Sequence, residues 1–243
     1  MPAALISSPY PFLKIIDDKK GVSMPSINQM IDHTLLRPSA TEKEITALCQ
    51  EAIQHQFASV CVNPCHLPLT KRLLVNTDVK LCTVIGFPLG ANRTEIKVAE
   101  TEAALRDGCD EFDMVINIGA LKGGDDDKVL SDIAAVVAAA KGKCVKVIIE
   151  TFFLTDEEKI RAVRLASLAG AAFVKTCTGF NEGRATANDI SLMKTHAGEG
   201  VLVKASGGIR SYKQALAMIE AGASRIGTSA GVKIAAESMA DQL

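Results

Sequence analysis

The chain has 243 residues, of which 48% are hydrophobic and 23% are charged, and its formal net charge is −1. This length and apolar content predict one α/β domain built around a single large core. The near-neutral charge excludes the overall basic field that concentrates proteins on nucleic acid or anionic membranes. Base-stacking surfaces are also disfavoured, because only 4% of the residues are aromatic and none is tryptophan. The expected partner is a small molecule.

Seven cysteines are spread along the chain without a compact paired framework. This pattern favours free thiols in a reducing compartment, so we expect a cytoplasmic protein. Every apolar run is shorter than the roughly 18 to 20 residues of a membrane helix, and no membrane partner is expected. Residues 1–23 differ in composition from the rest and lack the features of a signal peptide. We interpret them as an N-terminal extension, with the catalytic domain spanning residues 24–243.

From Ile31 onward, short β-branched runs alternate with longer stretches of helical periodicity. The runs are IDHTLL (31–36), ASVCVN (58–63), KLCTVIGF (80–87), EFDMVIN (111–117), CVKVIIE (144–150), AFVKT (172–176), GVLVKA (200–205) and SRIGTS (224–229). Eight strand-helix units in roughly 210 residues predict an α/β fold with a single (β/α)8 TIM barrel, whose strands are buried on both faces. A doubly wound open sheet is the alternative, because a repeating pattern alone does not show closure.

Several of the intervening helices carry signals at their ends. Three starts place a capping side chain three residues ahead of a carboxylate. Three ends contain a glycine that can adopt the left-handed conformation before the next strand, in RDGCDEFDM, SLAGAAFVK and IEAGASRIG. The predicted capping pairs are Thr41 with Glu44, Asn92 with Glu95, and Thr155 with Glu158.

Polar side chains stand near the ends of the predicted strands, where a barrel gathers its catalytic groups. Two ammonium groups held close in a desolvated site disfavour each other's protonation, so one lysine of such a pair can be a neutral amine. That amine can form a Schiff base with a carbonyl, while a carboxylate such as Asp113 moves protons through water. The alternative for a single lysine is a surface or ion-paired role. The strand-end residues are Asp32, Asn63, Thr83, Asp113, Asn117, Glu150, Lys175 and Lys204.

Glycine and hydroxyl clusters follow the seventh and eighth predicted strands, in ASGGIRS and GTSAG. Gly207 and Gly208 allow the backbone to approach an anion closely. The N–H groups around Thr228, Ser229 and Ala230 are expected to point at it from the start of a helix. Barrels often hold a phosphate at these two strand ends, so the sequence predicts a phosphate site here.

A metal site has little support in the sequence. Cys61, Cys65 and His66 lie close together in SVCVNPCH, but no second cluster completes a four-ligand set. We therefore expect no metal ion and no other cofactor.

Seven segments, in order along the chain, together resemble the deoxyribose-phosphate aldolases: IDHTLL, SVCVNP, GFPLGA, DMVINIGALK, FVKTCTGF, VKASGGIR and RIGTSAG. The resemblance implies a class I aldolase of the TIM-barrel fold. Such an enzyme reversibly cleaves 2-deoxy-D-ribose 5-phosphate to D-glyceraldehyde 3-phosphate and acetaldehyde, through a lysine Schiff base and without cofactor. The implied partners are the phosphorylated sugar and small aldehydes, and a homo-oligomer is compatible with the sequence.

The resemblance also implies roles for individual residues. Lys175 takes the place of the lysine that forms the Schiff base, and Lys204 that of the second lysine, whose charge favours a neutral nucleophile. Asp113 takes the place of the carboxylate that relays protons. The implied phosphate ligands are Gly179, Gly207, Gly208 and Ser229. The implied contacts to substrate hydroxyls are Asp32, Thr34 and Thr178.

The chain departs from the family pattern at a few positions. Cys177 stands where many bacterial members have serine, and Phe152 where glycine is frequent. The segment NEGRAT carries Glu182 and Arg184 where relatives are richer in glycine. Some members end in a tyrosine that assists proton transfer, whereas this sequence ends in ESMADQL.

Two other functions remain open on the sequence. One is a different Schiff-base or phosphosugar barrel, such as a transaldolase-like enzyme or an isomerase. The other is a phosphosugar-binding barrel that has lost catalysis. The first is disfavoured because the lysine, TGF and SGG elements occur together, and the second because both lysines and Asp113 are retained.

Overall fold

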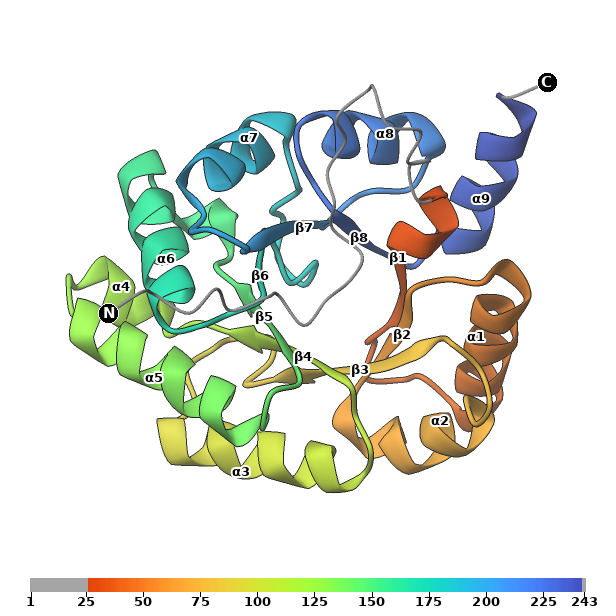
Figure 1. Cartoon of the computed structure of the whole chain (residues 1–243), viewed down its shortest axis with the longest axis horizontal. Helices are drawn as coiled ribbons and strands as arrows, with labels where there is room; N and C mark the ends of the chain where they lie inside the picture. Colours follow the sequence, from red (N-terminus) through yellow and green to blue (C-terminus); the bar gives the residue numbers. More distant parts are fainter. Residues whose placement is uncertain (1–25, 242–243) are drawn as a thin grey trace, which may run out of the picture.

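The computed structural model describes residues 26–241, so the predicted extension at residues 1–23 lies outside the described residues. Eight parallel strands, paired in chain order, close into a barrel that helices surround (Figure 1). This closure confirms the predicted TIM barrel and excludes the open sheet. The strands are β1 (Ile31–Leu35), β2 (Ser59–Val62), β3 (Lys80–Ile85), β4 (Glu111–Val115), β5 (Cys144–Ile148), β6 (Phe173–Lys175), β7 (Leu202–Ser206) and β8 (Arg225–Thr228).

Two of the three predicted N-terminal helix caps are confirmed. Thr41 and Thr155 each form a capping box with the glutamate three residues later. Asn92 was predicted wrongly, because α3 begins at Thr94, whose hydroxyl donates to Asp132 and so fixes the start by a tertiary contact. The helices are α1 (Glu42–His55), α2 (Leu67–Leu73), α3 (Thr94–Arg106), α4 (Ile118–Lys122), α5 (Asp126–Ala139), α6 (Asp156–Leu168), α7 (Ala187–His196), α8 (Tyr212–Glu220) and α9 (Gly231–Ala240), with 3-10 turns η1 (Ile27–Met30), η2 (Pro64–His66) and η3 (Thr151–Phe153).

The predicted glycine endings are confirmed at all three helix-to-strand joints. Gly108, Gly170 and Gly222 have φ angles of 85°, 84° and 111°. A side chain is unfavourable at such angles, so glycine lets the chain turn from helix into strand there. Within residues 26–241, no helix combines the length and the apolar character needed to cross a membrane.

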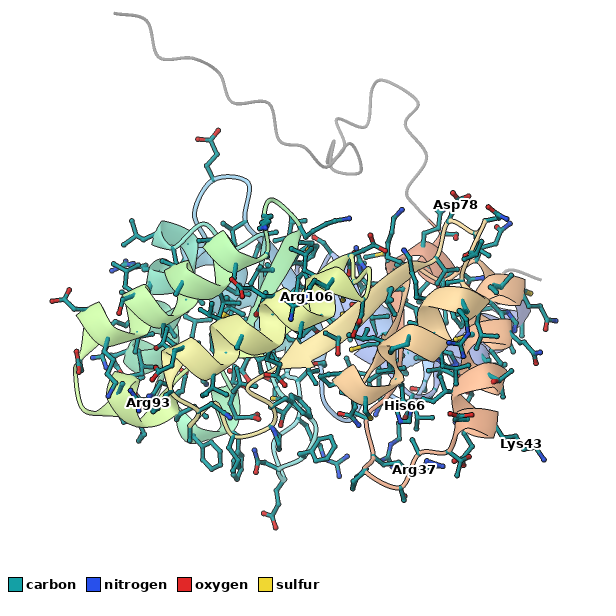
Figure 2. All side chains as sticks on the ribbon, turned by 90° about the horizontal axis from the view of Figure 1, so that it is seen from below. Arg37, Lys43, His66, Asp78, Arg93 and Arg106 are labelled. Carbon is teal, nitrogen blue, oxygen red and sulfur yellow. The ribbon has the colours of Figure 1, made fainter. Side chains whose placement is uncertain are left out.

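The loops that follow the strands gather on one face of the barrel. Arg37, His66 and Arg93, which follow β1, β2 and β3, lie along the lower edge in Figure 2, whereas Asp78, which precedes β3, lies at the upper edge. The lower edge is therefore the carboxyl-terminal face, where barrel enzymes carry their active sites.

The inside of the barrel is apolar near the amino ends of β5, β6 and β7. Cys144, Phe173 and Leu202 form a buried cluster there. Each lies two residues before a lysine of its own strand, and residues two apart in a strand share one face. The apolar cluster therefore forms a floor beneath the three lysines.

A buried ion pair ties two helices to β4. Lys97 of α3 places its Nζ 2.5 Å from Oδ2 of Asp132 in α5 and donates to the Val115 carbonyl at 2.9 Å. The two side chains are 0% and 3% exposed. Because Val115 ends the strand that carries Asp113, this pair helps to fix the position of that carboxylate.

Replacing Lys97 by methionine is expected to destabilise the fold by about 3–5 kcal/mol, because Asp132 would remain buried without a compensating charge. The free energy of unfolding in urea measures this loss. A double variant, Lys97→Met with Asp132→Leu, should recover most of the stability, since no uncompensated charge is left. A single variant as stable as the wild type would contradict the assignment.

Candidate active site

The strand register sets charged side chains beside one another inside the barrel. Lys175 of β6 is the register partner of Lys204 of β7. Asp113 of β4 is the partner of Lys146 of β5. Register partners on parallel strands point to the same face of the sheet, so these four side chains share the barrel interior. The two lysines predicted on neighbouring strands are therefore direct neighbours.

Asp113 is the centre of this arrangement. Its Oδ2 accepts hydrogen bonds from Lys175 Nζ at 2.8 Å and Lys204 Nζ at 2.7 Å, and its Oδ1 accepts one from Lys146 Nζ at 2.8 Å. Burial by itself would raise the pKa of Asp113, but the charges of the three ammonium groups hold it well below the usual value. Asp113 is therefore a carboxylate throughout the physiological pH range.

Two further carboxylates hold the lysines in place. Asp32 lies 2.5 Å from Lys204 Nζ and 2.6 Å from Arg225, and Glu111 lies 2.6 Å from Lys146 Nζ. Burial lowers the pKa of both Lys204 and Lys146, but attraction to Asp113 and its neighbouring carboxylates outweighs burial and raises it above the usual value. Lys146 and Lys204 are therefore fixed cations.

These side chains form a buried charged layer with four cations and three carboxylates, which leaves one positive charge in excess. Lys175 has one carboxylate within salt-bridge distance, whereas Lys204 has two and Lys146 has three. The side chain of Lys175 is also 4% exposed, while those of Lys146 and Lys204 are fully buried. The layer consists of Asp32, Glu111, Asp113, Lys146, Lys175, Lys204 and Arg225.

Three members of this layer are absent from the residues predicted at strand ends. Lys146 stands in the middle of β5, and Glu111 and Arg225 stand at the first residues of β4 and β8. The sequence does mark Lys146, because CVKVIIE places this lysine between two valines of an apolar run. In FVKT and VLVKA, Lys175 and Lys204 likewise follow a valine directly. No such signal marks Glu111 or Arg225, which resemble surface residues at a strand start.

Glu150, another strand-end residue, shapes the turn after Lys175. Its Oε2 accepts hydrogen bonds from the Thr178 hydroxyl at 2.5 Å, the Thr178 N–H at 3.1 Å and Asn181 Nδ2 at 3.1 Å. Glu150 is fully buried, and its backbone has a φ of 54°, which is uncommon for a residue with a side chain. The carboxylate thus fixes the TGF turn instead of forming an ion pair with Lys175.

Cys177 directly precedes Thr178 of this turn and is fully buried. Its Sγ is 3.3 Å from the Thr151 hydroxyl, and burial raises the pKa of the thiol to about 11. Cys177 is therefore a neutral, unreactive thiol near pH 7, and its role in this chain is packing.

The loops after β6, β7 and β8 expose unpaired backbone donors. Gly179, Gly207 and Gly208 have φ angles of 81°, 105° and 76°. Within the part of the chain that the structure describes, their N–H groups and that of Ser229 donate to no protein acceptor. The Ala230 N–H does not join them, because it donates to the Thr228 hydroxyl at 2.9 Å. The remaining donors suit an anion.

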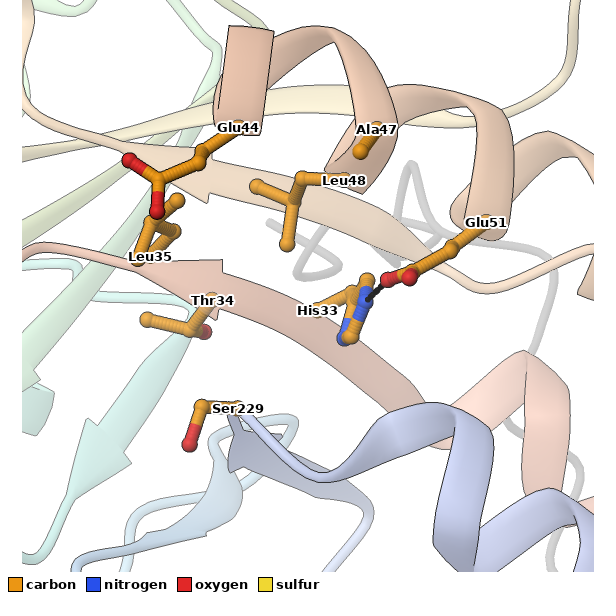
Figure 3. A pocket seen from close by; sticks show the side chains of 8 residues that line it. All are labelled: His33, Thr34, Leu35, Glu44, Ala47, Leu48, Glu51 and Ser229. Atoms are coloured by element: carbon orange, nitrogen blue, oxygen red, sulfur yellow. Dashed lines mark hydrogen bonds and ion pairs between the residues drawn. The ribbon is translucent and has the colours of Figure 1, made fainter. Parts of the chain in front are cut away.

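Thr34 and Ser229 line a cavity of about 180 Å³ beside β1 (Figure 3). The Thr34 hydroxyl donates to the Asp32 carbonyl at 2.8 Å. His33 lines the same cavity and places its Nε2 2.7 Å from Glu51, on the side of β1 that faces α1. Asp32 and His33 thus point to opposite sides of the strand, and only Asp32 joins the charged layer.

The other strand-end residues have structural partners. Asn63 and Thr83 each donate a side-chain hydrogen bond to a backbone carbonyl of the preceding strand segment. Asn117 caps α4 with its side chain. These three residues therefore shape the loops and helices around the barrel.

The charged layer also bears on metal binding. Cys61, Cys82 and Asp113 bring one possible ligand atom each to within 4.8 Å of one another. Three ammonium groups already surround Asp113, and they would repel a divalent cation. The electrostatics of this cluster therefore do not fit a metal centre.

The sequence matches the family model described as DeoC/LacD family aldolase over residues 26–237. It is 60% identical over 212 residues to a deoxyribose-phosphate aldolase from Thermococcus gammatolerans, covering 86% of this chain and 94% of the relative. The deoxyribose-phosphate aldolase of Caldanaerobacter subterraneus subsp. tengcongensis is 56% identical over 222 residues, covering 90% and 96%.

Solved structures agree with this match. A putative deoxyribose-phosphate aldolase from Coccidioides immitis superposes with a TM-score of 0.86 at 44% identity, covering 88% of this chain and 85% of that one. The tetrameric deoxyribose phosphate aldolase from Aeropyrum pernix gives 0.82 at 35% identity, covering 89% and 92%. The chain therefore belongs to the deoxyribose-phosphate aldolases of the DeoC/LacD family, carbon-carbon lyases, which confirms the resemblance seen in its sequence.

Proposed function

We propose that the protein reversibly cleaves 2-deoxy-D-ribose 5-phosphate to D-glyceraldehyde 3-phosphate and acetaldehyde through a Schiff base on Lys175. The observation that carries this proposal is the lysine pair on Asp113. Lys175 Nζ and Lys204 Nζ lie 2.8 and 2.7 Å from the same carboxylate oxygen, Oδ2. One amine of such a pair serves as nucleophile while the other stays charged.

The charge balance of the layer supports Lys175 as the nucleophile. Four cations face three carboxylates, so the layer is neutral once one lysine has lost its proton. Of the three lysines, Lys175 has the fewest carboxylate contacts, so loss of its proton removes the least electrostatic attraction from the layer. It also ends β6 at the carboxyl-terminal face, where a substrate carbonyl can reach it.

In the proposed reaction, the neutral Lys175 amine attacks the C1 aldehyde of the open-chain sugar, and loss of water gives an iminium ion. The C3 hydroxyl then loses its proton as the C2–C3 bond breaks, and the bonding electrons form an enamine with the iminium. D-glyceraldehyde 3-phosphate leaves, a proton adds at C2, and water releases acetaldehyde from the lysine. We propose that Asp113 relays these protons through water, with the Lys204 ammonium as the charge beside it.

The phosphate is proposed to bind the free N–H groups of Gly179, Gly207, Gly208 and Ser229. Thr34 and Thr178 are proposed to contact substrate hydroxyls. Asp32 is fully buried between Lys204 and Arg225, and we propose that it acts on the substrate through Lys204. A homo-oligomer is also proposed, because the Aeropyrum pernix relative is tetrameric.

Reductive trapping tests the mechanism. Incubation with acetaldehyde followed by borohydride is expected to modify Lys175, as mapped by peptide mass spectrometry, because its amine is the one that forms an iminium. Lys146 and Lys204 should remain unmodified as fixed cations, and exposed Lys143 serves as the control for non-specific reaction. EDTA should not change product formation. Absence of the Lys175 adduct, or loss of activity on chelation, would refute the mechanism.

A further inference from the structure

Arg184 lies directly on the glycine turn after β7. A Cβ added to Gly208 would meet the Cγ, Cδ and Cβ atoms of Arg184 at 3.0, 3.2 and 3.4 Å. The stem of this arginine therefore covers Gly208, and the guanidinium is attached to the Cδ atom of this contact. The φ of 76° at Gly208 favours glycine, and the close contact with Arg184 leaves little room for a side chain.

The segment that carries Arg184 is held against the turn from two sides. The Ala185 N–H donates to the Gly207 carbonyl at 3.0 Å. On the other side, a Cβ added to Gly183 would meet the Phe152 Cβ at 2.5 Å, so the Phe152 side chain packs against this segment. The two unusual residues of the chain, Phe152 and Arg184, thus belong to one packed arrangement.

The charge of Arg184 is not neutralised by the protein. The side chain is exposed, and no carboxylate among residues 26–241 lies within 4.0 Å of its guanidinium. Beside it, the N–H groups of Gly207 and Gly208 have no protein acceptor. An unpaired guanidinium next to unpaired backbone donors is a combination that favours a phosphate group.

We propose that Arg184 is a phosphate-binding residue that makes this chain specific for phosphorylated over unphosphorylated sugars. Its guanidinium donates charge-assisted hydrogen bonds to the phosphate oxygens, while the glycine turn supplies backbone donors. The inference rests on the proposed function, since it assigns the phosphate of that substrate to this turn.

The test compares an Arg184→Gln variant with a matched Arg106→Gln variant. Arg106 is exposed at the end of α3, on the outer surface (Figure 2), and its replacement removes the same charge. Arg184→Gln should raise the KM for 2-deoxyribose 5-phosphate about tenfold with little change in kcat. It should leave kcat/KM for unphosphorylated 2-deoxyribose unchanged, and Arg184→Lys should restore part of the affinity. Arg106→Gln should change neither substrate.

Binding of inorganic phosphate, measured by calorimetry on the full chain, separates this proposal from the proposed function. Weaker phosphate binding to Arg184→Gln than to wild type supports the arginine contact even if the wild type cleaves neither sugar. An unchanged phosphate affinity overturns the proposal. It is also overturned if both sugars lose kcat/KM equally, because Arg184 would then act only on the loop.

Discussion

A Lys175→Leu variant is expected to lose cleavage of 2-deoxyribose 5-phosphate by at least about 10⁴-fold, because the amine that forms the Schiff base is gone. The other amines of the charged layer do not replace it. Lys204 and Lys146 are fully buried and have pKa values above the usual range, so they remain protonated. Steady-state cleavage and borohydride trapping measure the loss, and neither should be detectable.

The same variant is expected to unfold no more readily than the wild type. Removing Lys175 leaves three cations with three carboxylates and removes a single ion pair, that with Asp113, which keeps Lys146 and Lys204 as partners. A Lys146→Leu variant is the matched control, because it leaves the same charge balance but removes the ion pairs of Lys146 with all three carboxylates. We expect that control to lose about 3–5 kcal/mol of unfolding free energy. Substantial activity in Lys175→Leu, or a loss of stability equal to that of Lys146→Leu, would contradict these roles.

The fold was predictable because its repeated unit leaves a regular pattern. Each strand is a short β-branched run, and each helix-to-strand joint carries a turn residue, such as the glycines at Gly108, Gly170 and Gly222. The start of α3 was not predictable, because the contact of Thr94 with Asp132 joins two helices that are distant in sequence. Local capping rules carry no information on such contacts.

The charged layer was predictable only in part. Lys175 ends β6, and Lys204 stands next to the last residue of its predicted run, so the strand ends mark both lysines. Asp113 stands in the middle of β4, and it is marked by the resemblance of the segment DMVINIGALK to the family. Lys146 stands mid-strand, and its inward direction depends on the register of β5 with β4. Arg225 reaches Asp32 across 193 positions of sequence, a contact that exists only because β8 closes the barrel onto β1. The charge balance that favours Lys175 as the nucleophile therefore requires the structure.

A Lys204→Leu variant is expected to shift the pH profile of Schiff-base formation upward by roughly 1 to 3 pH units and to slow turnover near pH 7. Without the Lys204 charge, the layer has three carboxylates and two fixed cations, Lys146 and Arg225. A protonated Lys175 then makes the layer electrically neutral, so its charged form is favoured. A protonated amine is not a nucleophile. Single-turnover trapping of acetaldehyde across pH measures the shift.

The direction of this shift distinguishes a charge effect from simple damage to the site. Lys143→Leu is the control, since it removes the same charge from an exposed lysine paired with Asp110 outside the layer. That variant should keep the wild-type profile. Misplacement of Lys175 by the loss of Lys204 would lower the rate at every pH, whereas the rate lost through a charge effect is recovered at high pH. A slower variant with an unshifted profile would therefore refute the electrostatic role of Lys204, even though the residue mattered for turnover.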